Sequence, residues 1–265
     1  MTGAELAAFL EFAHELVAAA GAAILPHFRA ALAIENKGDA RDYDPVTEAD
    51  RAAEREIRAM IALRYPDHRI RGEEDGTGGG ESQLTWVIDP IDGTRSFVLG
   101  QLHWGTLVAL HDGTRPVLGI MHQPFVGESF SAVAGGDAIW ERDGRRRRLR
   151  SRPCARLDGA MLACTTPEMF PDARSLAAFE RVRACVRLTR FGSDCYGYCL
   201  LAMGLVDVVV EADLQAYDVQ ALIPIVEASG GVITRWDGSS CEEGGEVVAC
   251  GDPALHASVL ALLRG

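Results

Sequence analysis

The sequence predicts an α/β (α+β) protein in which two lobes, about residues 1–151 and 152–265, pack into one domain. The N-terminal lobe begins with two amphipathic helical patterns and continues with short apolar runs that alternate with turn residues. Such runs are typical of hairpins, so we expect an antiparallel sheet there. In the C-terminal lobe strand patterns alternate with helical ones, which predicts a sheet covered by helices.

The N-terminal lobe opens with a predicted helix over residues 4–28, where apolar side chains recur at helical spacing. A polar loop is expected at 34–39. A second helix is predicted over 47–65, and Pro66 ends it. A short strand is then expected at 68–71.

A glycine cluster at residues 76–80 lies beside the acidic pair Glu73 and Glu74. No Lys-Ser or Lys-Thr follows these glycines, so the segment is not a phosphate-binding P-loop. We expect a mobile loop, and we hypothesise that it acts as a lid or gates a metal site.

Hairpin signals fill the rest of this lobe. The strands are predicted at residues 106–111, 117–122, 129–134 and 138–142. The arginine-rich run 145–152 falls on the last strand of this meander. Because no aromatic residues interleave with the arginines, a charged edge strand is favoured over a nucleic-acid patch.

The C-terminal lobe alternates between strands and helices after a boundary near residues 150–157 that carries no flexible linker. Strands are predicted at 161–164, 188–191, 206–211, 232–234 and 247–250, and helices at 173–186, 194–203, 219–228 and 254–263. This alternation predicts helices that cover a sheet.

Composition excludes several classes of protein. The formal net charge of −12 argues against a general nucleic-acid binder. Seven cysteines without a CxxC pair predict core thiols in a reducing compartment rather than disulfides. The N-terminus lacks a basic leader, and the apolar run 16–26 is too short to span a bilayer, so we expect a cytoplasmic protein without nucleic-acid or membrane partners.

The most informative stretch is Trp-Val-Ile-Asp-Pro-Ile-Asp-Gly-Thr at residues 86–94. An apolar strand runs into Asp89 and Asp92, and two neighbouring carboxylates do not both stay ionised easily unless a cation lies between them. Oxygen ligands of this kind suit Mg²⁺ together with a substrate phosphate. Gly93 lets the backbone approach a ligand, and Thr94 opens a helix whose N-terminus attracts anions.

Other acidic residues have simple structural explanations when each is taken alone. Asp50 lies three residues after Thr47 and completes a helix capping box. Asp218 stands at the start of a predicted helix, where it can act as an N-cap. Glu73 and Glu74 are typical of a solvated surface loop. The constellation of these residues carries the argument for a metal site.

Taken together, the motifs Gly72-Glu73-Glu74, residues 86–94 and Tyr217-Asp218-Val219, with a helix that ends in residues 227–231, resemble the inositol monophosphatase superfamily. The resemblance covers nearly the whole chain. It implies a layered α-β-α-β-α sandwich, a lithium-sensitive, Mg²⁺-dependent phosphomonoesterase activity, and a homodimer.

The resemblance also implies a ligand set for two or three Mg²⁺ ions. Glu73, Asp89 and the Ile91 carbonyl would hold one ion. Asp89 would bridge to a second ion, which Asp92 and Asp218 would also bind.

Catalytic roles follow from the same resemblance. Asp50 and Thr94 would form a hydrogen-bonded pair that helps to deprotonate the attacking water, beside the metal ligand Glu73. Backbone amides at Gly93 and Thr94 would hold the phosphate. Lys37, the only lysine, matches a loop lysine near the metals.

Within the superfamily, three strings are most similar to histidinol-phosphate phosphatases. They are Thr94-Arg95-Ser96-Phe97, Trp104-Gly105-Thr106-Leu107 and Gly192-Ser193-Asp194-Cys195-Tyr196, the last with a serine where a second glycine is expected. Asp194 and Glu211 would suit the ammonium and imidazole groups of histidinol phosphate, and Arg95 is a further candidate. An N-cap role for Asp194 stands equally open, and Glu211 could also bind ring hydroxyls.

The sequence thus predicts a phosphoric monoester hydrolase that converts L-histidinol phosphate to L-histidinol and phosphate. Alternatives are inositol-1-phosphate, fructose-1,6-bisphosphate or 3′-phosphoadenosine-5′-phosphate as substrate. A non-catalytic metal- or phosphate-binding protein is the alternative from another class.

Overall fold

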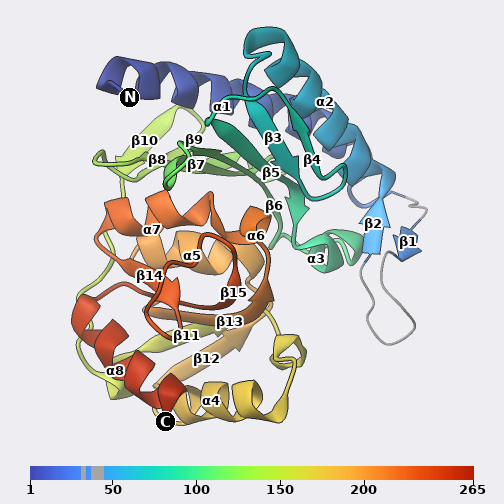
Figure 1. Cartoon of the computed structure of the whole chain (residues 1–265). Helices are drawn as coiled ribbons and strands as arrows, with labels where there is room; N and C mark the ends of the chain where they lie inside the picture. The colour runs from blue at the N-terminus through green and yellow to red at the C-terminus, as the bar shows by residue number, and fades with distance from the viewer. Residues whose placement is uncertain (31–33, 37–44) are drawn as a thin grey trace.

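The computed structural model describes residues 1–30, 34–36 and 45–265, and these form five layers (Figure 1). Helices cover the outer face of each of two sheets, and further helices fill the space between the sheets. From the N-terminal side the helical layers are α1 (Gly3–Ile24) with α2 (Glu48–Arg64), then α5 (Asp194–Ala202) with α7 (Leu222–Ser229), then α4 (Ala173–Arg183) with α8 (Pro253–Arg264). The predicted α-β-α-β-α sandwich is confirmed.

Local signals fix the first helices. Thr2 and Glu5 form a capping box at the start of α1, and Thr47 and Asp50 form another at the start of α2. The polar loop predicted at 34–39 is wrong for its first three residues, because Ile34–Asn36 (β1) pairs antiparallel with Pro45–Thr47 (β2). The rest of that predicted loop lies outside the described residues.

The apolar run 16–26, which is by itself too short to span a bilayer, lies mostly within α1, and that helix reaches 22 residues. By length and composition α1 could cross a membrane, and in the described part of the chain it is the one helix that could. Phe12, Leu16 and Ile24 are buried in a core shared with α2 and the sheet, so packing accounts for this apolar character. The cytoplasmic location stays a prediction.

The N-terminal sheet has eight strands in the order β10-β9-β8-β7-β6-β5-β3-β4. Their bounds are β3 (Arg69–Gly72), β4 (Thr77–Gly79), β5 (Thr85–Asp92), β6 (Gly105–His111), β7 (Pro116–Gln123), β8 (Glu128–Val133), β9 (Ile139–Arg142) and β10 (Arg145–Arg148). The sheet is antiparallel as predicted except where β3 and β5 pair parallel. This exception arises because the chain passes from β3 to the edge strand β4 and returns on the other side of β3.

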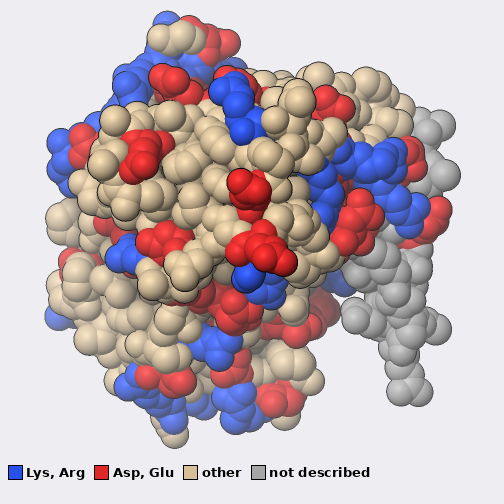
Figure 2. Space-filling model, turned by 45° about the horizontal axis from the view of Figure 1, so that its top comes forward, with Lys and Arg blue, Asp and Glu red and all other residues tan. Residues whose placement is uncertain are grey.

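Two predictions for this sheet have different outcomes. The glycine cluster at 76–80 is not simply a loop, because Thr77–Gly79 pairs antiparallel with β3. The first half of the arginine run forms an exposed edge strand, β10, whereas residues 149–152 lie outside any strand, so the prediction is confirmed only for Arg145–Arg148. Arg148 pairs there with Asp137, and Arg147 lies over the Trp140 ring. On the face drawn in Figure 2, basic and acidic side chains are interspersed.

The C-terminal sheet has five strands in the order β12-β11-β13-β15-β14. They are β11 (Met161–Cys164), β12 (Leu188–Phe191), β13 (Val208–Leu214), β14 (Val232–Arg235) and β15 (Gly245–Cys250). The helix predicted at 219–228 is instead two helices, α6 (Ala216–Val219) and α7. Pro224 explains the break, because it has no amide to donate to the Gln220 carbonyl.

All seven cysteines are free, and five of them are buried: Cys164, Cys195, Cys199, Cys241 and Cys250. The prediction of core thiols is therefore confirmed for these five. Cys185 is exposed and Cys154 is partly so. The reducing compartment stays a prediction.

The two lobes share a core. One buried cluster combines Leu107 and Phe130 of the N-terminal sheet with Tyr198 and Val209 of the C-terminal lobe. Gly119 on β7 lies so close to the segment between α6 and α7 that an added Cβ would come within 1.9 Å of the Ala221 carbonyl oxygen. We therefore propose that both lobes unfold as one domain.

Substitution Gly119→Ala tests this proposal. The extra methyl group must push Ala221 away, and overpacking of this kind costs about 1–3 kcal/mol of unfolding free energy. Gly159→Ala is the control, because a Cβ there meets no atom within 4 Å. We expect Gly119→Ala to lower the midpoint of a single thermal transition, measured by circular dichroism. Two separate transitions in the wild-type protein would contradict one domain.

Candidate active site

Asp89 and Asp92 are carried by β5, whose central residues are buried. The strand pairs with β6 as far as Asp89, opposite Leu107, and pairing resumes at Asp92, opposite Gly105. One extra residue on β5 therefore forms a bulge between the two aspartates. Both aspartates line the same cavity as a result.

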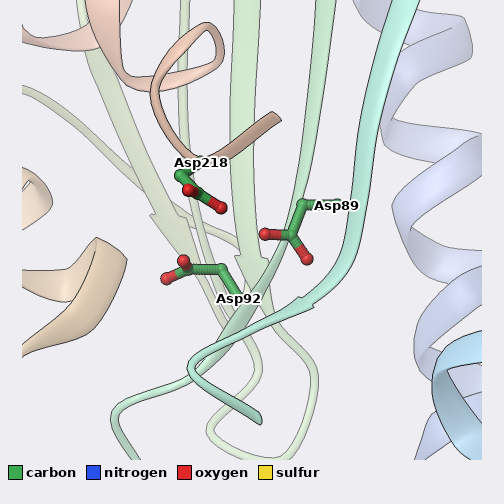
Figure 3. Close-up of side chains that lie close together, drawn as sticks. All are labelled: Asp89, Asp92 and Asp218. Carbon is green, nitrogen blue, oxygen red and sulfur yellow. The ribbon is translucent and has the colours of Figure 1, made fainter. Parts of the chain in front are cut away.

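Asp218 reaches this cavity from the C-terminal lobe, on α6. Its Oδ2 accepts a hydrogen bond of 2.6 Å from the Gln215 amide, so Asp218 is the third residue of a capping box rather than the N-cap itself. Carboxylate oxygens of Asp89, Asp92 and Asp218 all lie within 4.8 Å of one another. Figure 3 shows the Asp89 and Asp218 carboxylates facing each other, with Asp92 beneath them.

These three residues fit a divalent cation. Asp89 Oδ1 is buried and has no hydrogen-bond partner among the described residues. Burial raises the pKa of Asp89 well above its usual range, and the charges of Glu73, Asp92 and Asp218 raise it further. Burial also raises the pKa of Asp92 and of Asp218. A hard cation with oxygen ligands would offset this repulsion.

Two further predicted ligands lie at the same cavity. Glu73 follows β3 and lines the cavity, close enough for its charge to raise the pKa of Asp89. Ile91 also lines it, and its carbonyl oxygen accepts a hydrogen bond of 2.9 Å from Thr94 Oγ1. The structure thus brings Glu73, Asp89, Ile91, Asp92 and Asp218 to one place.

In the described part of the chain, one carboxylate oxygen of Asp50 is hydrogen-bonded and the other has no hydrogen-bond partner. Its Oδ2 accepts hydrogen bonds from the Thr47 amide at 2.9 Å and the Thr47 hydroxyl at 2.6 Å, as the capping box requires. Its Oδ1 is buried and unpaired within the described ranges. Burial raises the pKa of Asp50 to about 6. Because Thr94 donates to Ile91 in this structure, the Asp50–Thr94 pair stays a prediction.

Gly93, with φ of 83°, leads into α3 (Thr94–Val98), and both Gly93 and Thr94 line the cavity. Asp194 lies across from them in the first turn of α5, where φ of 44° is unusual for a non-glycine residue. The N-cap position belongs to Ser193, so the N-cap explanation of Asp194 is wrong. Asp194 Oδ2 instead accepts a hydrogen bond of 2.9 Å from Ser96 Oγ.

Glu211 is a buried carboxylate on β13 at the same cavity. Its Oε1 accepts from the Thr165 amide at 3.0 Å and the Thr165 hydroxyl at 2.6 Å, and its Oε2 accepts from the Tyr198 hydroxyl at 2.9 Å. Burial raises the pKa of Glu211 to about 7 despite these bonds. The carboxylate is therefore held firmly and stays close to its protonation midpoint near neutral pH.

The cavity has a volume of about 580 Å³ and an acidic wall. Beyond the metal-ligand candidates, that wall carries Asp194, Glu211, Glu168 and Asp213, the last two exposed at its edge. Arg95 is the one basic residue among the described residues that line it, and its charge lowers the pKa of Asp194 against the effect of burial. Lys37 lies outside the described residues.

Comparison with known proteins then decides the family. The model of the inositol monophosphatase family matches residues 5–265. The chain belongs to this family. The bifunctional phosphatase IMPL2 of Arabidopsis thaliana is 37% identical over 280 residues, which cover 100% of this chain and 77% of that protein. The histidinol-phosphatase of Chlorobaculum parvum is 33% identical, and the match covers 96% of each protein.

A solved structure of an inositol monophosphatase from Zymomonas mobilis has 38% sequence identity and a TM-score of 0.87, with both chains covered in full. These findings confirm the predicted class: the chain is a phosphoric monoester hydrolase of a metal-dependent family. The same findings favour the enzyme over the non-catalytic alternative.

Sequence reasoning missed the residues that support the family's acidic side chains. Thr165, Tyr198 and Ser96 hold Glu211 and Asp194, although they come from three separate segments. Nothing in their local sequence indicates this contact. Glu54 and Arg58 of α2 were also missed. Here a signal existed, because Glu54 lies four residues after Asp50 and Arg58 four residues after Glu54, which places all three on one helix face.

Because the pKa values of the ligand candidates are raised, we expect metal binding to strengthen as the pH rises. Burial raises the pKa of Asp89 and Asp92, and that of Asp218 to about 7. In the metal-free protein, these carboxylates therefore stabilise the folded state at low pH, where they are protonated, and this stabilisation is lost as pH rises through their raised pKa values. A bound cation replaces those protons, so Mg²⁺ should raise the melting temperature more at about pH 8 than at about pH 5.

Differential scanning fluorimetry with and without Mg²⁺ measures this difference. Asp89→Asn is the matched control, because it removes a central carboxylate without changing side-chain size, and it should lose most of the Mg²⁺-dependent increase. An equal increase at both pH values would show that these carboxylates do not hold the ion.

Proposed function

We propose that this chain is a Mg²⁺-dependent phosphatase that hydrolyses L-histidinol phosphate to L-histidinol and inorganic phosphate. The observation that carries the substrate assignment is the acidic wall beyond the metal-ligand candidates. Glu211 is buried and Asp194 is partly buried in the cavity, and the exposed Glu168 and Asp213 lie at its edge. A phosphate ester with a cationic tail complements such a wall.

Charge separates this substrate from the alternatives. Histidinol phosphate carries an ammonium group and a titratable imidazole, which can pair with Asp194 and Glu211. Fructose-1,6-bisphosphate and 3′-phosphoadenosine-5′-phosphate would instead bring a second phosphate toward the same carboxylates, and juxtaposed like charges are unfavourable. Burial raises the pKa of Asp194 to about 6, while the hydrogen bond from Ser96 and the charge of Arg95 act against this rise. A cationic substrate group beside Asp194 would further favour its ionised form.

Similarity supports this proposal and one alternative. The histidinol-phosphatase of Chlorobaculum parvum matches over 96% of this chain, and the Zymomonas mobilis inositol monophosphatase matches over all of it. Inositol-1-phosphate is therefore the second candidate. Glu211 already accepts three hydrogen bonds, and a carboxylate has about four acceptor sites, so it could bind one further donor from either substrate.

For the metal, we propose Mg²⁺, with two or three ions in each site. Glu73, Asp89 and the Ile91 carbonyl would hold one ion, and Asp89, Asp92 and Asp218 another. When bound, such ions lower the pKa of water and stabilise the charge that develops on phosphate oxygens. The chain's own contribution is to hold these ligands at fixed positions through the β5 bulge and the α6 capping box.

The remaining site residues would handle the proton and the phosphate. Asp50 Oδ1, buried and unpaired in the described structure, can accept a hydrogen bond from the Thr94 hydroxyl and so help to remove a proton from the attacking water. Backbone amides of Gly93 and Thr94 would bind phosphate oxygens at the start of α3. Glu73 and Lys37 would act at the metals, as the family resemblance implies.

Other features also remain proposals. The family resemblance implies a lithium-sensitive homodimer, and composition leads us to expect a cytoplasmic protein that binds neither nucleic acid nor membrane. From its place beside Glu73, the glycine-rich segment at 76–80 would act as a lid or gate the metal site, a movement that would have to break the pairing of Thr77–Gly79 with β3.

A substrate panel tests the assignment. We expect kcat/KM for L-histidinol phosphate to exceed that for inositol-1-phosphate by at least about tenfold, which corresponds to about 1.4 kcal/mol of transition-state binding. Phosphate release in the presence of Mg²⁺ measures this, with fructose-1,6-bisphosphate and 3′-phosphoadenosine-5′-phosphate as further substrates. Asp194→Asn should reduce the histidinol phosphate value by about tenfold and the inositol phosphate value by much less. Equal losses would contradict a cation site at Asp194.

Asp92→Asn tests the mechanism independently of the substrate. Asparagine keeps the size of the side chain but removes the charge, so Mg²⁺-dependent turnover should fall by more than about a hundredfold for every substrate. Unchanged circular dichroism would show that the fold persists. Full turnover by this variant would rule out the proposed metal centre.

A further inference from the structure

One face of α2 carries three charged side chains in line. Asp50, Glu54 and Arg58 follow one another at i, i+4 spacing. The Glu54 side chain is completely buried, with 0% exposure, and Arg58 is 17% exposed. A buried carboxylate is costly to maintain unless several donors surround it, so its partners indicate what it does.

The partners of Glu54 lie in the turn that follows β3. Its Oε2 accepts a hydrogen bond of 2.8 Å from the Glu74 amide, and its Oε1 accepts one of 3.1 Å from the Asp75 amide. Arg58 Nε donates to the same Oε1 at 2.7 Å. The Arg58 guanidinium also donates to the Gly76 carbonyl. Side chains of α2 therefore bind three successive residues of this turn.

The same contacts confine Glu73 from both sides. Its amide donates to the Ile88 carbonyl at 3.2 Å, which continues the pairing of β3 with β5. The turn closes where the Gly72 amide donates to the Gly76 carbonyl at 2.9 Å. An added Cβ on Gly72 would come within 2.0 Å of Glu54 Oε1, so glycine is required for Glu54 to reach the turn.

We propose that Glu54, held by Arg58, is a positioning residue that fixes the carboxylate of Glu73 at the metal centre. The Glu54 bonds hold the two residues that directly follow Glu73, and Glu73 itself lines the cavity. Because Asp50 lies one helical turn away on the same helix, this clamp also sets the distance between the proposed proton acceptor and the metal ligand. The inference deepens the proposed function and rests on its metal centre.

Glu54→Gln is the direct test. Glutamine has the same size, but its NH₂ group cannot accept a backbone amide, so one of the two amide bonds to the turn is lost. Removing the partners of metal ligands typically weakens metal affinity by about 10–100-fold. We expect Mn²⁺, titrated into the metal-free protein and followed by electron paramagnetic resonance, to bind at least about tenfold more weakly. In Mg²⁺-dependent assays the half-saturating Mg²⁺ concentration should rise, and kcat should recover at saturation.

Asp207→Asn is the matched control. Asp207 is also a buried carboxylate that accepts from a backbone amide, that of Met161 at 2.7 Å, and from Arg152 at 3.1 Å. It lies in the C-terminal lobe beside β11, away from the described cavity. Its substitution should lower thermal stability and leave Mn²⁺ affinity unchanged.

The outcomes separate this inference from the metal centre itself. Wild-type affinity in Glu54→Gln, with binding abolished in Asp89→Asn, would overturn the role of Glu54 and leave the metal centre in place. Failure of the wild-type protein to bind Mn²⁺ would overturn both. If Glu54→Gln does not fold, Arg58→Lys takes its place, because it keeps the charge but not the two-pronged contact. Wild-type Mn²⁺ affinity in Arg58→Lys would then overturn the inference.

Discussion

The main constraint on this structure is that it must hold together carboxylates that repel one another, at the place where the two lobes join. Asp89 and Asp92 come from a buried strand of one lobe and Asp218 from a short helix of the other, within 4.8 Å of one another. Burial and like charge raise their pKa values, so the cluster is unfavourable in its ionised form. The shared core between the lobes must hold these groups together until a cation offsets the repulsion.

Hydrogen bonds to the backbone help to hold these carboxylates in position. The β5 bulge places Asp89 and Asp92 at one cavity, and the α6 capping box orients Asp218 toward it. Helix α2 binds the turn that begins at Glu73. Each device uses backbone amides rather than side-chain packing, so each fixes direction as well as distance. Such precision is what phosphoryl transfer requires of a protein whose main task is to position charge.

A second set of carboxylates gives the cavity its expected selectivity. Asp194 and Glu211 are not metal-ligand candidates. Asp194 accepts a hydrogen bond from the Ser96 hydroxyl, and Glu211 accepts from the amide and hydroxyl of Thr165 and from the Tyr198 hydroxyl. Burial raises the pKa of Asp194 to about 6 and that of Glu211 to about 7, so a cationic group of the proposed substrate would favour their ionised forms. Arg95 is the one basic residue among the described residues that line the cavity. Family membership sets the reaction class, whereas the proposed preference for a cationic ester rests on this wall.

The sequence by itself determined the features that depend on residues close together in the chain. These are the capping box of Thr47 and Asp50, the hairpins, and the strand that ends in Asp89 and Asp92. Through family resemblance it also indicated the layered fold and the reaction class. Only the tertiary structure decided the parallel pairing of β3 with β5, the strand formed by Thr77–Gly79, and the contact of Glu54 with the turn after β3. Periodicity and capping act over a few residues, whereas these contacts join segments that approach only when the core is packed.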